Sequence, residues 1–365
     1  MYGNRKILAG VLILVFALVS WAIPVWSNGN EDNVEAAPSF LARVNSKIFK
    51  VLFFDVTRGF VQIDEVDRDE NPVLDDSGTA KKKTVQVPFI VLVLILGAIF
   101  FTFWYRWINI RGFEHAIDVI RGKHDKPEDT GEISHFRALT SALSATVGLG
   151  NIAGVAVAIQ LGGPGAVFWM LIAAVFGMSA KFSSCTLSQM YRKINADGTV
   201  SGGPMYYLDI GLSGSRYKVL KVLGKALAVM YALMIMGGAI GGGNMFQANQ
   251  TAEAFASTFG ISDIGTWNWV IGIILAIGVG VVIIGGIKRI GAATSKIVPF
   301  MCGIYVLASL FIILTHISQI PETIRLIFTM AFTKNAYYGG LFGVLVMGVR
   351  RAAFSNEAGL GSTAI

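Results

Sequence analysis

The feature that most constrains this chain is an uncharged apolar stretch at residues 140–169, which is long enough to cross a bilayer. Its middle reads TVGLGN (residues 146–151). Each glycine costs about 1 kcal/mol relative to alanine inside a helix, so this middle opposes a continuous helix. Non-helical backbone at membrane depth is tolerated only where it is buried in protein or lines a watery cavity. We therefore predict a broken helix, the device with which secondary transporters build a binding site.

Composition supports a membrane protein. The chain is 54% hydrophobic and only 15% charged, whereas soluble domains carry about 25% charged residues. Its basic residues fall in short loops between apolar segments, as the positive-inside rule expects, so the net charge of +7 predicts no nucleic-acid partner. Cys185 and Cys302 lie within apolar segments and are predicted to be free thiols. No metal-ligand spacing occurs, and we expect no cofactor.

Three regions are predicted along the chain. Residues 1–27 have the basic start and apolar run of a signal peptide or an uncleaved signal anchor, and the sequence does not decide between them. Residues 28–86 are polar and partly acidic, and we predict an extracytoplasmic extension. Residues 87–365 form the predicted membrane domain.

Apolar segments and basic loops alternate through the membrane domain, which predicts a multi-pass α-helical protein. A short amphipathic surface helix is expected at 113–121, a cytoplasmic loop with glycine turns at 191–225, and an external segment at 318–338. The predicted spans cover residues 87–104, 140–161, 166–190, 226–247 (with an end that extends to 255), 267–284 and 291–315, and a last span starts at 339.

The last span repeats the pattern of the first interrupted one. Glycine, serine and asparagine crowd its middle, FSNEAGLGS (residues 354–362), and the sequence stops at Ile365 without a polar tail. We expect the chain to be the front part of a longer protein, truncated in this helix. The two interrupted helices enter from opposite sides with four spans between them. This pattern is typical of a five-plus-five inverted repeat whose first and sixth core helices are discontinuous.

At this point the sequence resembles a known family. The motifs TVGLGNIAGVAVAIQLGGPGAVFW, SGGPMYYLDIGL and GVRRAAFSNEAGLGS, in this order, are similar to those of the alanine or glycine:cation symporters, also called sodium:alanine symporters. The resemblance covers residues 89–365. It implies Na⁺-coupled import of alanine or glycine on the leucine-transporter-type fold, in the inner (cell) membrane of a prokaryote. The N-terminal extension is not part of the family core, and ligands from the second repeat are absent.

The first candidate site is the interrupted middle of the first core helix. Free amides at the start of its outer half suit a substrate carboxylate, and carbonyls ending its inner half suit Na⁺. The alternative is a packing groove of small residues. The predicted substrate-binding residues are Gly148, Leu149, Gly150 and Asn151, and Thr146 and Asn151 are candidate Na⁺ ligands.

The second candidate site lies in the last span. Ser355, Asn356 and Gly359 are predicted to bind substrate, and Ser355 and Ser362 are further Na⁺ candidates. A carboxylate inside a span is expensive and usually functional, which singles out Glu357. It could gate the pathway or form an ion pair with Arg350 or Arg351. The alternative is a purely structural role at the vestibule.

A third set lies on the third core helix, where Asn244 and Gln247 are predicted to face the substrate and Phe246 to act as a lid. Amides that satisfy each other between helices are the alternative. Lys181, well inside the second core helix, either pairs with a carboxylate or extends its ammonium group to the membrane surface.

We interpret the chain as a Na⁺-coupled symporter for a small neutral amino acid that works by alternating access. A proton-coupled transporter that uses Glu357 is the nearest alternative. A membrane sensor whose residues 28–84 face outward is an alternative from another class. An enzyme is not expected, because no nucleophile–base pair or histidine-rich metal cluster is apparent.

Overall fold

The computed structural model describes residues 54–56, 62–64, 82–84, 89–125, 131–261, 264–332, 357 and 361–362. The chain divides into two units, residues 1–50 and 51–365, and all described residues belong to the second. The predicted signal segment therefore lies outside the described residues, as does most of the predicted extension. Neither prediction is tested.

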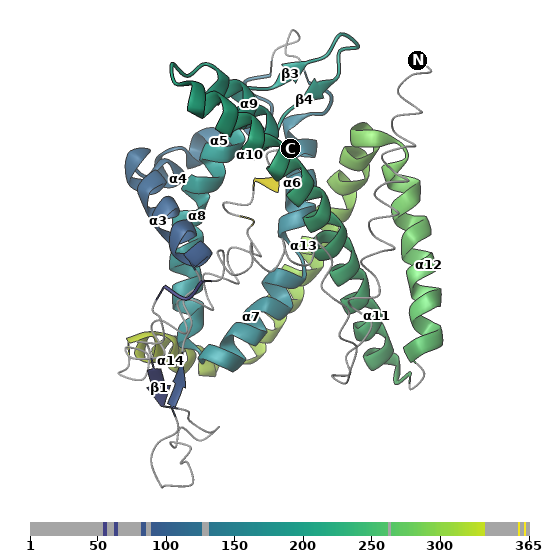
Figure 1. Ribbon diagram of the computed structural model, residues 1–365. Coiled ribbons are helices and arrows are strands. Elements are labelled where there is room, and N and C mark those ends of the chain that lie inside the picture. Colours follow the sequence, from purple (N-terminus) through teal and green to yellow (C-terminus); the bar gives the residue numbers. More distant parts are fainter. Residues whose placement is uncertain are drawn as a thin grey trace, which may run out of the picture. The chain divides into compact units, whose positions relative to one another are not determined.

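The described part is mostly helical, as predicted (Figure 1). The long helices follow the predicted order of spans. The helices are α3 (Phe89–Trp104), α4 (Ile108–Arg111), α5 (Phe113–Ile120), α6 (His135–Thr146), α7 (Leu149–Gly162), α8 (Gly165–Met190), α9 (Pro204–Ser213), α10 (Lys218–Gly238), the π-helix η2 (Ala239–Met245), α11 (Phe246–Phe259), α12 (Ile264–Ile283), α13 (Gly286–Thr315), the 3₁₀-helix η3 (Ile317–Gln319) and α14 (Ile320–Phe332).

Two small antiparallel strand pairs correct the expectation of an all-α chain. Strand β1 (Gln62–Asp64) pairs with β2 (Lys82–Thr84), and β3 (Lys193–Ile194) pairs with β4 (Val200–Ser201). Both pairs lie in segments that the sequence indicated only as polar loop or extension. Pairs this short carry too few residues for a recognisable alternation of polar and apolar side chains.

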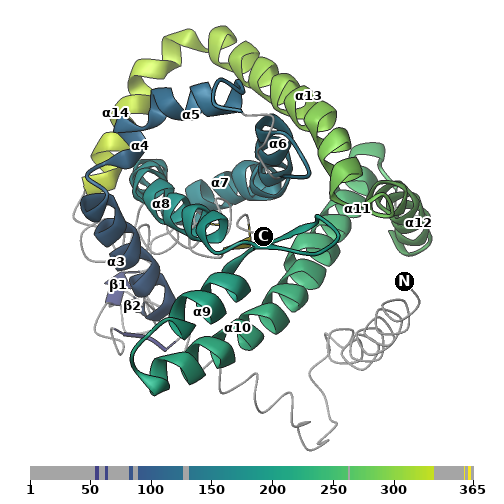
Figure 2. The ribbon, with the colours of Figure 1, turned by 90° about the horizontal axis from the view of Figure 1, so that it is seen from above.

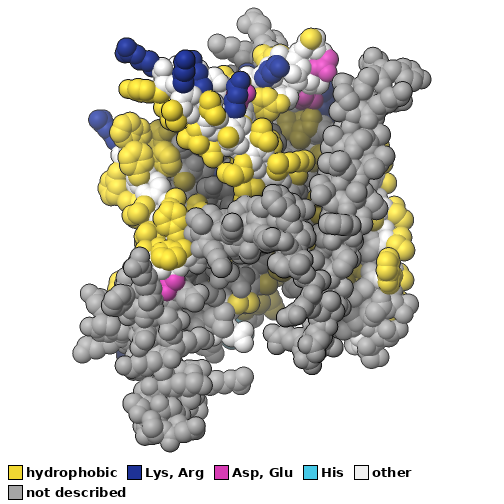
Figure 3. All heavy atoms as spheres, viewed as in Figure 1, with side chains coloured by type: hydrophobic (Ala, Val, Ile, Leu, Met, Phe, Trp, Pro, Cys, Tyr) yellow, Lys and Arg dark blue, Asp and Glu magenta, His cyan; other side chains and the backbone are white. Residues whose placement is uncertain are grey.

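Four helical runs are long and apolar enough to cross a membrane among the residues that the structure describes. Many of their large apolar side chains are exposed: Phe311 and Val219 are 69% and 76% exposed. Figure 3 shows hydrophobic side chains over much of the described surface, with Lys and Arg side chains gathered at the end where α9 and α10 lie. Such an apolar exterior requires a lipid environment, so this is an integral membrane protein. The runs are His135–Gln160, Gly165–Met190, Lys218–Phe259 and Gly286–Thr315.

Helix α8 is the shared packing partner of α3, α4, α7, α9 and α14. Polar side chains join it to its neighbours. The hydroxyl of Thr102 in α3 donates to the carbonyl oxygen of Phe176 at 3.3 Å, and the amide of Asn109 in α4 donates to the carbonyl of Val175 at 3.0 Å. Thr102 is fully buried. Small and polar residues at helix contacts are what close packing in lipid favours.

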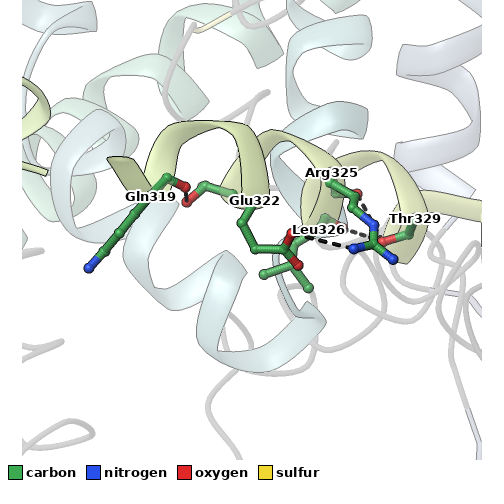
Figure 4. A network of polar contacts seen from close by, with 6 residues as sticks. Gln319, Glu322, Arg325, Leu326 and Thr329 are labelled. Carbon is green, nitrogen blue, oxygen red and sulfur yellow. Dashed lines mark hydrogen bonds and ion pairs between the residues drawn. The ribbon is translucent and has the colours of Figure 1, made fainter. Parts of the chain in front are cut away.

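The predicted external segment is largely the helix α14. Its polar side chains bond within the helix: Arg325 pairs with Glu322 at 3.5 Å, and the hydroxyl of Thr329 donates to the carbonyl of Arg325 at 2.9 Å (Figure 4). Its C-terminal end contacts α8, where the indole N–H of Trp169 donates to the carbonyl of Ala331 at 3.2 Å.

The cytoplasmic loop predicted at 191–225 is more ordered than its turn residues indicated. It contains the β3–β4 hairpin and α9, which lies alongside α10 (Figure 2). A Cβ at Gly224 would meet the carbonyl oxygen of Leu208 at 2.6 Å, so only glycine allows this approach. The third core helix also begins earlier and ends later than predicted, because α10, η2 and α11 run on continuously.

Gly165→Ala should destabilise the contact between α8 and α14. A Cβ there would lie 2.6 Å from the backbone of Met330 and Ala331, which cannot move aside as a flexible side chain could. We expect a loss of about 1–3 kcal/mol, seen as a lower thermal unfolding midpoint in detergent.

Gly237→Ala in α10 is the matched control, because nothing lies within 4 Å of its Cβ position. It should leave the midpoint unchanged or raise it slightly, since alanine favours the helix by up to about 1 kcal/mol. Equal midpoint shifts in the two variants would contradict the packing argument.

The stability of the β3–β4 hairpin turn should depend on pH only in acidic solution. The carboxylate of Asp197 accepts hydrogen bonds from the hydroxyl and the amide of Thr199, which lower the pKa of Asp197. A lowered pKa in the folded state gives stabilisation that is present above the ordinary value of about 3.9 and is lost as pH falls through the lowered value.

Exchange protection of residues 193–201 should therefore be constant between about pH 7 and 5 and fall only well below about pH 4. Protection factors from hydrogen–deuterium exchange, corrected for intrinsic rates, measure this. Asp197→Asn should remove the acid dependence of protection. Loss of protection with a pH midpoint near neutral would contradict the role of Asp197.

Candidate functional site

The helix break predicted at TVGLGN is present. Helix α6 ends at Thr146, Val147 is extended, and α7 begins at Leu149 after Gly148 (Figure 1). The backbone at Gly148 is also extended, with φ −170° and ψ −146°. The break falls inside the apolar run His135–Gln160, so this part of the prediction is confirmed.

The break leaves backbone polar groups without helical partners. The carbonyl of Gly148 accepts from the amides of Asn151 and Ile152 at 3.1 and 3.3 Å. Within the described residues, no hydrogen bond engages the amide of Gly150 or the carbonyl of Thr146. Donors at the start of α7 and acceptors at the end of α6 therefore lie on the two sides of one break. The helix dipoles place partial positive charge at the first and partial negative charge at the second.

Asn151 adds a side chain to this arrangement. Its oxygen Oδ1 is buried and makes no hydrogen bond in the part of the chain that the structure describes. A buried acceptor without a partner costs about 1–3 kcal/mol, so such an atom in a native site calls for a ligand or a functional explanation. Thr146 is half-buried, and its hydroxyl donates to the carbonyl of Ala142 at 3.2 Å, which leaves its oxygen able to accept or to coordinate.

The two halves of the broken helix pack against different neighbours. Helix α6 lies on α13, where the hydroxyls of Ser141 and Thr294 hydrogen-bond at 3.0 Å and Gly291 allows close approach to Arg137. Helix α7 packs mainly on α8. The break therefore joins two separately anchored helix halves, and its extended residues can absorb motion between them.

The second candidate site is described only in part. Glu357 and Ser362 are half-buried, and the Ser362 hydroxyl donates to Oε2 of Glu357 at 2.5 Å. The remaining predicted residues, and with them the predicted ion pair, lie outside the described residues and remain predictions. These are Arg350, Arg351, Ser355, Asn356 and Gly359.

Two residues of earlier helices that were not predicted for this site interact with Glu357. Its carboxylate interacts electrostatically with Lys181 of α8 and with Tyr231 of α10. The nearby Gly361 packs closely, because a Cβ there would lie 2.6 Å from Cγ of Pro204 and 2.9 Å from the Tyr231 hydroxyl. Of these residues, Lys181 could have been singled out from the sequence, because it is the single charged residue of α8. Tyr231 carried no signal in the sequence.

The third candidate set lies on the run Lys218–Phe259, which is long and apolar enough to cross a membrane. Asn244 and Phe246 are exposed and Gln247 is half-buried, all in the run from η2 to α11. Their elements pack mainly on α10 and α12. Across the described ranges, no hydrogen bond links Asn244 or Gln247 to Asn151. Their predicted contact with substrate stays a prediction.

The described residues contain no cluster of three or more His, Cys, Asp or Glu side chains that could hold a metal ion by such ligands. An alkali cation at the break would instead be held by neutral carbonyl, amide and hydroxyl oxygens. Fold and site together thus define an integral membrane protein with a helix interrupted inside an apolar span, the architecture of secondary transporters.

Residues 73–365 match the sodium:alanine symporter family, and the chain belongs to this family. It is 46% identical over 277 residues to the sodium/alanine symporter AgcS of Methanococcus maripaludis, covering 75% of this chain and 59% of that protein. It is 40% identical over 275 residues to the putative sodium/proton-dependent alanine carrier protein YrbD of Bacillus subtilis, covering 74% and 53%.

A third relative carries a different substrate in its name. The chain is 38% identical over 275 residues to the probable sodium/glutamine symporter GlnT of Bacillus subtilis, covering 75% of this chain and 54% of that protein. The chain thus spans little more than half the length of these curated relatives.

Proposed function

We propose that this protein is a Na⁺-coupled symporter that imports a small neutral amino acid, alanine or glycine, by alternating access. The observation that carries the proposal is the break between α6 and α7, with its unused backbone groups and the buried Oδ1 of Asn151. Family membership and the name of the relative AgcS support the coupling ion and the substrate class.

The two sides of the break suit the substrate carboxylate and the Na⁺ ion. The amides at the start of α7, at Leu149 and Gly150, offer donors and a positive dipole end for the substrate carboxylate. The carbonyls ending α6, with Oδ1 of Asn151 and the hydroxyl of Thr146, offer hard oxygen ligands for Na⁺. Gly148 and Gly150 add no side-chain bulk, which favours a close-bound, small substrate.

Coupling between Na⁺ and amino-acid binding follows because both would bind at the same helix break. Na⁺ at the end of α6 would fix the extended backbone of Val147 and Gly148, which also orients the amides of α7. By linkage, Na⁺ then raises the affinity for the amino acid and the amino acid raises the affinity for Na⁺ by the same factor. Separate anchoring of α6 on α13 and of α7 on α8 lets the two halves reorient around the bound cargo.

Two alternatives remain distinguishable. A proton-coupled transporter would use Glu357 as its titrating group, and the relative YrbD bears a name that includes both sodium and proton. A membrane sensor would leave the break as a packing feature that moves no solute. We place the protein in the inner membrane of a prokaryote, in line with relatives from Methanococcus maripaludis and Bacillus subtilis.

Alanine uptake by the full-length protein in proteoliposomes tests the function. Uptake should follow an inward Na⁺ gradient and not an inward K⁺ gradient. Gly150→Leu should reduce it by at least about tenfold, because the new side chain fills the break. Gly303→Leu in α13 makes the same change where no atom lies within 4 Å of the Cβ position, and should keep uptake near the original level.

Uptake that responds to pH and ignores Na⁺ would favour proton coupling. Absence of uptake for alanine, glycine and other small amino acids would refute the transporter proposal and favour the sensor.

Asn151→Ala tests the Na⁺ site without any transport. At a Na⁺ concentration about 100 times its dissociation constant, binding stabilises the folded protein by about 2.7 kcal/mol. Loss of one oxygen ligand should weaken Na⁺ about tenfold and remove about 1.4 kcal/mol of this stabilisation. The readout is the thermal unfolding midpoint in NaCl compared with the midpoint in KCl.

Asn109→Ala in α4 is the matched control, since its Oδ1 is also buried without a hydrogen bond in the described part. This variant should lower the midpoint in both salts and preserve the difference between them. A full Na⁺ response in Asn151→Ala would show that Asn151 is no ligand.

A further inference from the structure

The first turns of α10 carry an exposed basic face that the proposed function does not use. Lys221 and Lys225 follow Lys218 by three and seven residues, and all three side chains are exposed. At about 100° of rotation per residue, the three lysines lie on one side of the helix, within an arc of about 60°. Arg216, just before the helix, is exposed as well. Four cations are thus gathered at one end of α10.

These cations have no carboxylate partner within the described ranges, where the ion pairs join other residues. The first turn of α10 contains no acidic residue. Helix α9 packs on α10 and carries Asp209, which accepts a hydrogen bond from Ser213 of its own helix at 3.4 Å. The positive charge at this end of α10 is therefore not balanced by its described neighbours.

The lysines do not serve the stability of α10 itself. Lys218 and Lys221 lie in its first turn, where the helix dipole places partial positive charge and disfavours cations. Lys221 and Lys225 are four residues apart, a spacing at which like charges repel each other. A partner that carries negative charge would remove both unfavourable interactions.

An apolar stripe continues along α10 next to the lysines. Val222, Val229 and Leu233 are 69%, 62% and 61% exposed, and their spacing places them on one side of the helix, beside Lys218 and Lys225. Figure 3 shows the Lys and Arg side chains at this end of the molecule with hydrophobic side chains next to them. The exposed side of α10 thus begins with ammonium groups and continues with aliphatic side chains.

The other side of α10 is already occupied by protein. Gly224 and Ala228 are buried, and a Cβ at Gly224 would lie 2.6 Å from the carbonyl oxygen of Leu208 in α9. This contact fixes the rotation of α10 about its axis, so the lysines and the apolar stripe are presented together on the exposed side.

A phospholipid with an anionic headgroup combines the two features that this face requires. Its phosphate would lie among the ammonium groups, and its acyl chains would lie along the apolar stripe. A soluble anion matches the lysines alone, and a zwitterionic lipid leaves their charge unbalanced. Helix α10 opens a run that is long and apolar enough to cross a membrane, which places its first turns near the headgroups.

We propose that Arg216, Lys218, Lys221 and Lys225 form a binding site for an anionic phospholipid, whose acyl chains pack along Val222, Val229 and Leu233. The bound lipid stabilises the folded protein. The site does not involve the helix break, so the proposal stands or fails independently of amino-acid transport.

Thermal unfolding of the full-length protein in a non-ionic detergent tests the kind of ligand. Phosphatidylglycerol should raise the unfolding midpoint more than phosphatidylcholine with the same acyl chains, and added KCl should reduce the difference by screening the charges. Equal shifts with the two lipids would overturn the proposal. Inorganic phosphate at the same concentration should leave the midpoint unchanged. A shift as large as that with phosphatidylglycerol would identify a soluble-anion site instead.

A triple variant with Lys218→Gln, Lys221→Gln and Lys225→Gln tests the residues. Each cation near an anionic headgroup contributes about fivefold in affinity, so the apparent dissociation constant for phosphatidylglycerol should rise at least about thirtyfold. Titration followed by native mass spectrometry measures it. An unchanged constant would overturn the site.

The matched control removes the same charge from exposed lysines on three other parts of the chain, with Lys123→Gln, Lys193→Gln and Lys288→Gln. It should change the dissociation constant less than about threefold, because distant exposed charges are screened. Equal weakening in the two triple variants would show attraction by net charge alone and would overturn the site. If the first triple variant does not fold, Lys225→Gln alone should weaken binding about fivefold, and an unchanged constant would overturn the site equally.

Discussion

Every backbone N–H and C=O in a bilayer needs a hydrogen-bond partner, and this constraint governs the structure. The long helices satisfy it along their length. The chain departs from it inside an apolar span at Val147 and Gly148, where α6 stops and α7 starts. Groups left unused at such a depth are costly unless a ligand or water meets them. The break and the buried Oδ1 of Asn151 are thus two expressions of one cost, which the bound cargo is proposed to offset.

Around the break, α8 organises the packing. It contacts α3, α4, α7, α9 and α14, and buried Ser179, Ser183 and Ser188 lie along it. Small residues let neighbouring backbones approach, as the contact of Gly165 with α14 shows. The same helix packs against α7, the second half of the broken helix, and carries the half-buried Lys181.

The predicted features that the structure confirms are those encoded locally. The TVGLGN break could be predicted because glycine and extended-preferring residues lower helix stability wherever they occur. The span order followed from apolar length alone. The β3–β4 hairpin and α9 were missed, because turn residues such as Asp197 and Gly203 stand out in the sequence while the short elements between them do not. The predicted contact of Asn244 and Gln247 with substrate stays a prediction, because it depends on which helix face meets the substrate, and an apolar sequence conveys that poorly.

The sequence by itself determined that this chain spans a membrane, where its first core helix breaks, and which family it resembles. These properties depend on residue type over short stretches, and hydropathy and backbone preference report them directly. Only the tertiary structure decided that α6 and α7 are anchored on different helices, and that Gly361 packs against Pro204 and Tyr231. Such pairings depend on which faces of distant helices meet. In lipid that choice is made by small-residue contacts and single polar groups, whose partners no local pattern specifies.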